Sequence, residues 1–113
     1  MSEQSKHERI AETKVVFVDR YGTRTSVALA IGRPYQEDEE TAHCTLYMDG
    51  YDEPRAIFGL DTLQALCLAI RLMRVQLEHL VEFEYKIYSH EVDFEGEDLD
   101  DYLLPIDACF GRK

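Results

Sequence analysis

The sequence predicts an α+β fold, in which an antiparallel sheet of about four strands forms a meander and one long helix packs on one of its faces. Two observations lead to this fold class. Residues 61–82 carry apolar side chains at helical spacing, and four β-rich runs between residues 14 and 58 are separated by turn residues. A third observation adds an acidic C-terminal segment, because residues 91–107 contain eight acidic residues and no basic residue.

The 113 residues suffice for one domain with its own hydrophobic core. Residues 1–12 contain few apolar side chains, and we expect them to form a flexible N-terminal arm. Residues 13–113 should then form a single α+β domain that includes the acidic segment 91–107.

The first two strands are predicted as a hairpin. The β-branched and aromatic run 15–18 is followed by residues 19–23, whose Asp and Gly are typical of a hairpin loop. The partner strand, residues 25–31, alternates in side-chain size, so its larger side chains should share the face toward the helix. These are Val27, Leu29 and Ile31.

Two further strands are predicted before the helix. Gly32-Arg33-Pro34 ends the second strand, and the loop 36–40 is too charged to bury. A third strand over 42–48 and a short fourth strand over 55–58 follow. The side chains expected to face the helix are Cys44, Leu46, Met48 and Ile57 or Phe58.

The helix is predicted over residues 61–82. Asp61 is a suitable N-cap, Gln64 can complete a capping box, and Leu60 lies where a hydrophobic staple would. Its expected buried stripe consists of Leu63, Leu66, Ile70, Met73, Leu77 and Leu80, with Cys67 and Val81 at its edges. On this prediction Leu66→Ala or Ile70→Ala should cost roughly 2–5 kcal/mol.

Residues 83–88 leave two alternatives open. They could extend the helix or form a fifth strand, and the alternation of Phe83, Tyr85 and Ile87 slightly favours the strand.

Composition and charge narrow the class of partner. A net charge of −11 disfavours binding to nucleic acid and to anionic membranes, and it favours a basic protein. Three cysteines without a CxxC pair suggest reduced thiols, hence a cytoplasmic protein. No signal peptide and no run of 18 apolar residues is present in the sequence given.

The sequence contains no recognisable catalytic or metal-binding motif. The four histidines form no paired metal-ligand spacing, and they are expected to be satisfied or exposed. No register of residues 91–107 fits a calcium loop, and the scattered glycines make no phosphate cradle. We therefore expect a protein that is not an enzyme and that holds no cofactor or metal. Cys44 and Cys67 are expected to be buried.

The candidate site is a partner-binding surface formed by carboxylates and tyrosines. Clustered carboxylates attract basic surfaces, and exposed tyrosines are common interface anchors. The alternatives are that the acids only keep the protein solvated and that Tyr21, Tyr35, Tyr47 and Tyr51 cover the ends of the sheet. The predicted partner-binding residues are Glu91, Asp93, Glu95, Glu97, Asp98, Asp100, Asp101, Tyr102 and Tyr51.

A resemblance adds to these inferences. The strand ending in Gly32-Arg33-Pro34 and the helix opening Asp61-Thr62-Leu63-Gln64-Ala65-Leu66 resemble a family of small bacterial domains of unknown function. The resemblance covers about residues 14–82 and stops before the acidic segment. It implies a sheet plus one helix and assigns no catalytic residues. Small acidic proteins of this general shape are similar to immunity proteins that neutralise toxins. This analogy concerns size, charge and shape, and no shared site residue.

The leading hypothesis is therefore a cytoplasmic protein-binding module, an immunity-type inhibitor that neutralises a basic toxin or effector through its acidic surface. One alternative is a nucleic-acid mimic that inhibits a DNA-binding or phage-defence protein, because duplex DNA is a dense line of negative charge. Another is a homo-oligomeric structural module that pairs, as a homodimer for example, through a strand edge.

Overall fold

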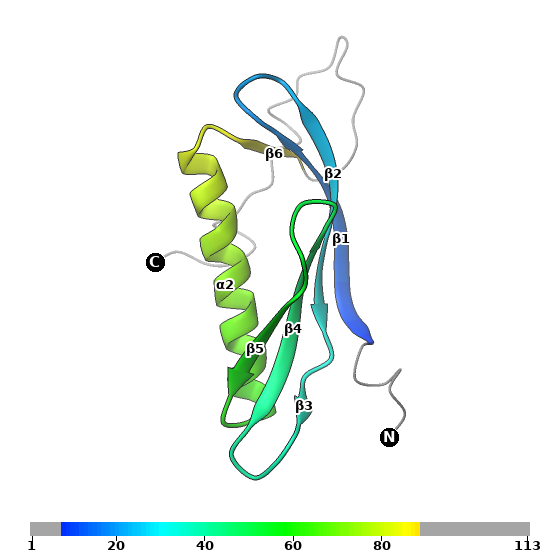
Figure 1. The fold of residues 1–113 in the computed structure, drawn as a ribbon, viewed down its shortest axis with the longest axis vertical. Helices are drawn as coiled ribbons and strands as arrows, with labels where there is room; N and C mark the ends of the chain where they lie inside the picture. The colour runs from blue at the N-terminus through cyan, green and yellow to red at the C-terminus, as the bar shows by residue number, and fades with distance from the viewer. Residues whose placement is uncertain (1–7, 89–113) are drawn as a thin grey trace.

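A computed structural model describes residues 8–88 of the chain, which form one antiparallel sheet with a single helix across one face (Figure 1). The strands are β1 (Arg9–Val18), β2 (Arg24–Gly32), β3 (Tyr35–Gln36), β4 (Ala42–Asp49), β5 (Arg55–Gly59) and β6 (Lys86–Tyr88). The helix α2 spans Thr62–Glu82 and lies between β5 and β6 in the sequence.

The sheet follows the predicted meander and adds two strands to it. β1, β2, β4 and β5 pair in sequence order, and every pairing is antiparallel. β3 pairs with the start of β4 on the same side as β2, because Pro34 interrupts the strand that the two would otherwise form. β6 pairs with β1 at the far edge. The fold class is confirmed, whereas the expected number of about four strands is too low.

β6 answers the question that residues 83–88 left open. α2 ends at Glu82, and the chain reverses through Glu84, whose φ is 69°. The Tyr85 N–H donates to Leu80 O at 3.0 Å and the Glu84 N–H to Val81 O at 3.0 Å, which is a Schellman motif. This turn directs the chain back to β1, so the segment becomes a strand.

The first strand begins earlier than the sequence suggests. β1 starts at Arg9, inside the segment 1–12 that was expected to be an arm, and pairs with β2 as far as Gly32. The Arg9 guanidinium lies 4.2 Å from the ring centroid of Tyr47 and also forms an ion pair with Asp49. These contacts come from β4, so the local sequence around Arg9 could not reveal them.

The hydrophobic core lies between α2 and the sheet. The predicted inward side chains of β2 and β4 are all buried, namely Val27, Leu29, Ile31, Cys44, Leu46 and Met48. Of the two candidates on β5, Ile57 packs against the core, and Phe58 is 58% exposed. The strand alternation therefore assigns the buried face correctly.

The helix buries a different stripe from the predicted one. Its buried residues are Ala65, Ala69, Met73, Leu77 and Leu80. In contrast, Leu63, Ile70 and Val81 are 69%, 39% and 49% exposed, Cys67 is exposed, and Leu66 is only partly buried. The prediction that these five side chains are buried is therefore wrong for Leu63, Cys67, Ile70 and Val81, and it is partly right for Leu66.

Close packing at the start of the helix explains the difference. A Cβ added to Gly59 would lie 2.7 Å from the Ala65 backbone nitrogen, so the chain before the helix approaches its first turns very closely. Only small side chains fit at such an approach. Ala65 and Ala69 therefore face the sheet, and the bulkier Leu63 and Ile70 are rotated away from it.

The N-terminal cap of the helix agrees with the prediction in part. Asp61 Oδ1 accepts from the Gln64 N–H at 2.7 Å, as an N-cap should. Gln64 Oε1 accepts from the Leu60 N–H at 2.7 Å, one residue earlier than in a standard capping box. Leu60 is 63% exposed, so its side chain does not serve as the expected hydrophobic staple.

A pair of alanine substitutions tests the orientation of the helix. Leu77→Ala should lower the free energy of unfolding by roughly 2–5 kcal/mol, because Leu77 is fully buried. Ile70→Ala should cost less than about 1 kcal/mol, because that side chain is 39% exposed. Urea denaturation of both variants measures the difference, and equal losses would contradict this orientation.

A second pair of substitutions tests the turn after the helix. Glu84→Gly should raise the free energy of unfolding by about 1 kcal/mol, because glycine adopts a positive φ without the clash of a side chain. Glu82→Gly is the matched control. It should lower stability by roughly 0.5–1 kcal/mol, since it places glycine within the last helical turn. Destabilisation by both changes would argue against the Schellman motif.

Candidate protein-binding surface

The longest run of acidic residues that the structure describes is in the loop between β3 and β4, which contains Glu37, Asp38, Glu39 and Glu40. All four are exposed. The loop lies at the end of the sheet where β4 begins and β5 ends, because Ala42 pairs with Gln36 on one side and with Gly59 on the other. The first turn of α2 follows at once, so this end brings the loop close to residues 58–63 (Figure 1).

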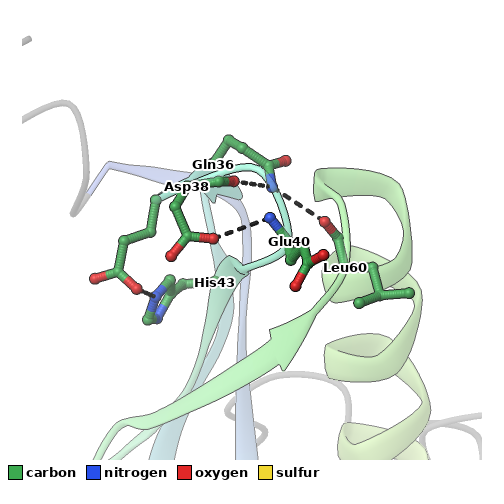
Figure 2. Close-up of polar contacts among 6 residues, drawn as sticks. Gln36, Asp38, Glu40, His43 and Leu60 are labelled. Carbon is green, nitrogen blue, oxygen red and sulfur yellow. Dashed lines mark hydrogen bonds and ion pairs between the residues drawn. The ribbon is translucent and has the colours of Figure 1, made fainter.

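Hydrogen bonds fix the loop to the start of the helix (Figure 2). The Gln36 side-chain amide donates to Asp38 O at 2.7 Å and to Leu60 O at 3.0 Å. Within the loop, the Glu40 N–H donates to Asp38 Oδ1 at 2.9 Å. The four carboxylates are therefore presented from a defined backbone.

His43 is the one buried polar residue among residues 8–88, and it lies beneath this loop. Its ring stacks on Tyr35 with centroids 4.9 Å apart, and the ring of Phe58 approaches it edge-on at 4.5 Å. His43 Nε2 lies 2.9 Å from Glu37 Oε2. The prediction of a satisfied histidine holds for His43, and the histidine on the helix, His79, is exposed as expected.

Exposed apolar side chains lie at the same end of the sheet as the acidic loop. Phe58, Leu60 and Leu63 are 58%, 63% and 69% exposed. Protein interfaces commonly combine apolar anchors at the centre with polar and charged residues at the rim. We call the loop residues Glu37–Glu40 together with Phe58, Leu60 and Leu63 the tip surface.

The net charge is divided between this part of the chain and the C-terminal segment. Residues 8–88 contain fourteen acidic and nine basic residues, and residues 89–113 contain eight acidic and two basic. Between residues 35 and 61 there are eight acidic residues and a single basic one, Arg55. Arg55 is paired with Asp52 at 2.9 Å, so the tip surface has a strongly negative environment.

The predicted partner-binding residues fall into two groups. Eight lie outside the described residues, namely Glu91, Asp93, Glu95, Glu97, Asp98, Asp100, Asp101 and Tyr102. The ninth, Tyr51, is at the turn between β4 and β5, away from the tip surface (Figure 1). Its ring packs against Phe17 and Tyr85, with centroids 5.1 Å and 6.4 Å away.

The other tyrosines and the cysteines have differing environments. Tyr21 is 79% exposed, whereas Tyr47 is buried beneath Arg9 and offers little surface to a partner. Cys44 is buried as predicted, and burial raises the pKa of its thiol. Cys67 is exposed, contrary to the prediction, because the buried stripe of the helix is rotated away from it.

Sequence reasoning missed the tip surface. The loop was recognised as charged, but nothing in the sequence placed it beside Phe58. The strand register does so, because His43 pairs directly with Phe58 across β4 and β5. A hydrophobic residue on the outward position of a predicted edge strand was the available signal.

The described part of the chain shows no group of three or more His, Cys, Asp or Glu side chains that could hold a metal ion. None of its helices is long and apolar enough to cross a membrane.

Comparison with known protein families finds a match over most of the chain. The model of a family described as a domain of unknown function, DUF6968, matches residues 13–105. This match extends into the acidic segment as far as residue 105, whereas the resemblance noted from the sequence stopped before that segment. No curated protein matches the chain, and no solved structure matches it.

The carboxyl of Asp38 provides a test of the loop geometry by pH titration. The Glu40 N–H, and then Thr41, donate to this carboxylate and hold its pKa below the ordinary value of 3.8. The stabilisation is present above pH 3.8 and is lost as pH falls through the lower pKa of the folded state. NMR titration should find a lower midpoint for Asp38 in the folded chain than in urea. Equal midpoints would show that the loop does not hold this carboxylate.

Proposed function

The chain belongs to the DUF6968 family, whose function is unknown, and we propose that it is a protein-binding module that captures a basic protein, in the manner of an immunity-type inhibitor that neutralises a toxin or effector. The observation that carries the proposal is the tip surface. Four exposed carboxylates, at Glu37–Glu40, and three exposed apolar side chains share one end of the sheet, on a backbone fixed by hydrogen bonds.

The two components of the tip surface have different tasks in this proposal. The carboxylates attract a basic partner over a distance and raise the rate of encounter. Phe58 and Leu63 then lose their exposed area to the partner, which slows dissociation. A surface of acids alone would give attraction without a persistent complex.

The fixed backbone of the loop reduces the cost of binding. A loop that becomes ordered only on binding loses conformational entropy at that moment, which weakens the complex. Here the bonds from Gln36 to Asp38 and Leu60 hold the loop before any partner arrives. Because the loop is already ordered, it favours specific binding of one partner over nonspecific attraction to any basic protein.

The acidic segment and the location of the protein complete the proposal. Carboxylates at residues 91–101 add negative charge for the same partner, and this contribution is tested separately below. We also propose a cytoplasmic location, because Cys44 and Cys67 are free thiols, and free thiols are typical of reducing compartments.

The first experiment identifies a partner and then measures its binding kinetics. The chain is used to capture proteins from a native lysate at low and at moderate salt, and the basic protein retained in stoichiometric amount is purified. Glu39→Gln with Glu40→Gln should slow its association about three- to tenfold and reduce the salt dependence, because both carboxylates are exposed.

The matched control removes the same charge at the other end of the helix. Glu82→Gln with Glu84→Gln should leave the association rate nearly unchanged, since both residues lie beyond the far end of α2 or in its last turn. Equal slowing by both pairs would mean that only net charge matters, and the tip surface would be rejected.

Substitution of an exposed apolar side chain tests the rate of dissociation separately from the rate of association. Leu63→Ser should speed dissociation about tenfold or more, with little change in association rate, because the lost contact is short-ranged.

Asp98→Asn, Asp100→Asn and Asp101→Asn together test the acidic segment, and should slow association further. Competition by duplex DNA for the captured protein would instead support a nucleic-acid mimic.

A further inference from the structure

A second feature lies at the opposite end of the described structure, away from the tip surface. A cavity of about 370 Å³ opens between the β1–β2 turn, the β4–β5 turn and the end of α2. Cavities of about 300–1,000 Å³ are typical of small-ligand sites. The side chains that matter to the argument are Asp19, Arg20, Tyr21, Tyr51, Phe83 and Tyr85.

Four of the seven residues that line the cavity are aromatic. Tyr51 and Tyr85 pack edge-to-face with each other and with Phe17, whose ring is fully buried beneath them. The Schellman motif at the end of α2 fixes Tyr85 in this position. Tyr51 is 43% exposed and Phe83 72% exposed, so aromatic surface remains available to a ligand.

One carboxylate is fixed in the same wall. Asp19 Oδ1 accepts from the Tyr21 N–H at 2.8 Å and from the Thr23 N–H at 2.9 Å. These bonds hold the carboxylate at the rim of the cavity through the turn itself. The negative charge is therefore placed beside the rings without the cost of ordering a free side chain.

We propose that this cavity binds an organic cation, an ammonium or guanidinium group held between the tyrosine rings and the Asp19 carboxylate. The faces of aromatic rings attract cations, and a carboxylate accepts strong charge-assisted hydrogen bonds from the same cationic group. Free amines and the side chains of lysine and arginine share this chemistry. The proposal stands independently of the tip surface.

The net charge of the described residues favours a cation over an anion. Residues 8–88 carry five more acidic than basic residues, so their field repels anions from the site. Arg20 already lies over the ring of Tyr21, with Cζ 5.0 Å from the centroid, which shows the same cation–aromatic contact within the chain. Arg20 therefore competes with the ligand and does not select it.

Calorimetric titration of the full chain with small probes tests the proposal. N-acetyl-lysine methylamide and N-acetyl-arginine methylamide should bind, and N-acetyl-norleucine methylamide, which lacks the charge, should bind at least tenfold more weakly. Tighter binding of 1,5-diaminopentane than of the blocked amino acids would identify a free amine as the source. Tighter binding of the blocked amino acids would identify a protein side chain. Equal binding of the neutral probe would overturn the proposal.

Substitutions in the β1–β2 turn distinguish an effect of charge on binding from an effect on folding. Asp19→Asn keeps an oxygen that accepts from Tyr21 and Thr23, and it should weaken cation binding about tenfold. Arg20→Gln should strengthen cation binding two- to threefold, because it removes the competing guanidinium. Thermal melts of both variants check that the chain folds. Weaker cation binding in Arg20→Gln, or an unchanged affinity in a folded Asp19→Asn chain, would overturn the assignment.

NMR of the tyrosine rings locates the bound probe. Signals of Tyr51 and Tyr85 should shift on titration, and the signal of Tyr35, at the other end of the sheet, should not. Tyr51→Phe keeps the ring and should retain binding, whereas Tyr51→Leu removes it and should weaken binding about five- to tenfold. Shifts confined to Tyr35 would place the cation elsewhere and reject the site.

Discussion

The close approach between the start of α2 and the end of β5 is the constraint on which the rest of this structure depends. Gly59 leaves no room for a Cβ beside the Ala65 nitrogen, and Ala65 and Ala69 are fully buried against the sheet. Tight contact at this point fixes the rotation of the helix about its axis. Once the rotation is fixed, Met73, Leu77 and Leu80 complete the core, and Leu63 and Ile70 are left outside it.

The two ends of the helix then define two regions of different chemistry. At its start, the chain that enters the helix accepts a hydrogen bond from Gln36 through Leu60 O, which ties the acidic loop to exposed apolar side chains. At its end, the reversal at Glu84 sends β6 to the edge of the sheet and leaves Tyr85 among the aromatic rings. A single element therefore orients both candidate binding regions.

The electrostatic interactions of the two regions differ in range. The tip surface presents several exposed carboxylates, and the attraction proposed between them and a basic partner is long-ranged and weakens with added salt. The cavity at the other end combines a single carboxylate with aromatic faces, and such contacts act only at short range. The binder proposed for each region carries positive charge, in keeping with a chain of net charge −11.

The candidate sites were much less visible in the sequence than the fold. The charge of residues 37–40 was evident, but its proximity to Phe58 depends on the pairing of β4 with β5. Tyr51 was correctly singled out as a tyrosine at a turn, yet its neighbours Phe17 and Tyr85 come from distant parts of the chain. Spacing within one segment carries no information about contacts between segments.

The sequence by itself determined the α+β class, the capped helix, the inward faces of β2 and β4 and the excess of negative charge. These properties follow from local periodicity, turn residues and composition, which need no knowledge of neighbours in space. Only the tertiary structure decided which stripe of α2 is buried, because bulky side chains suggested one face and the space beside Gly59 admitted another. It also decided that β6 joins the sheet, since its partner β1 lies some seventy residues away and only folding brings them together.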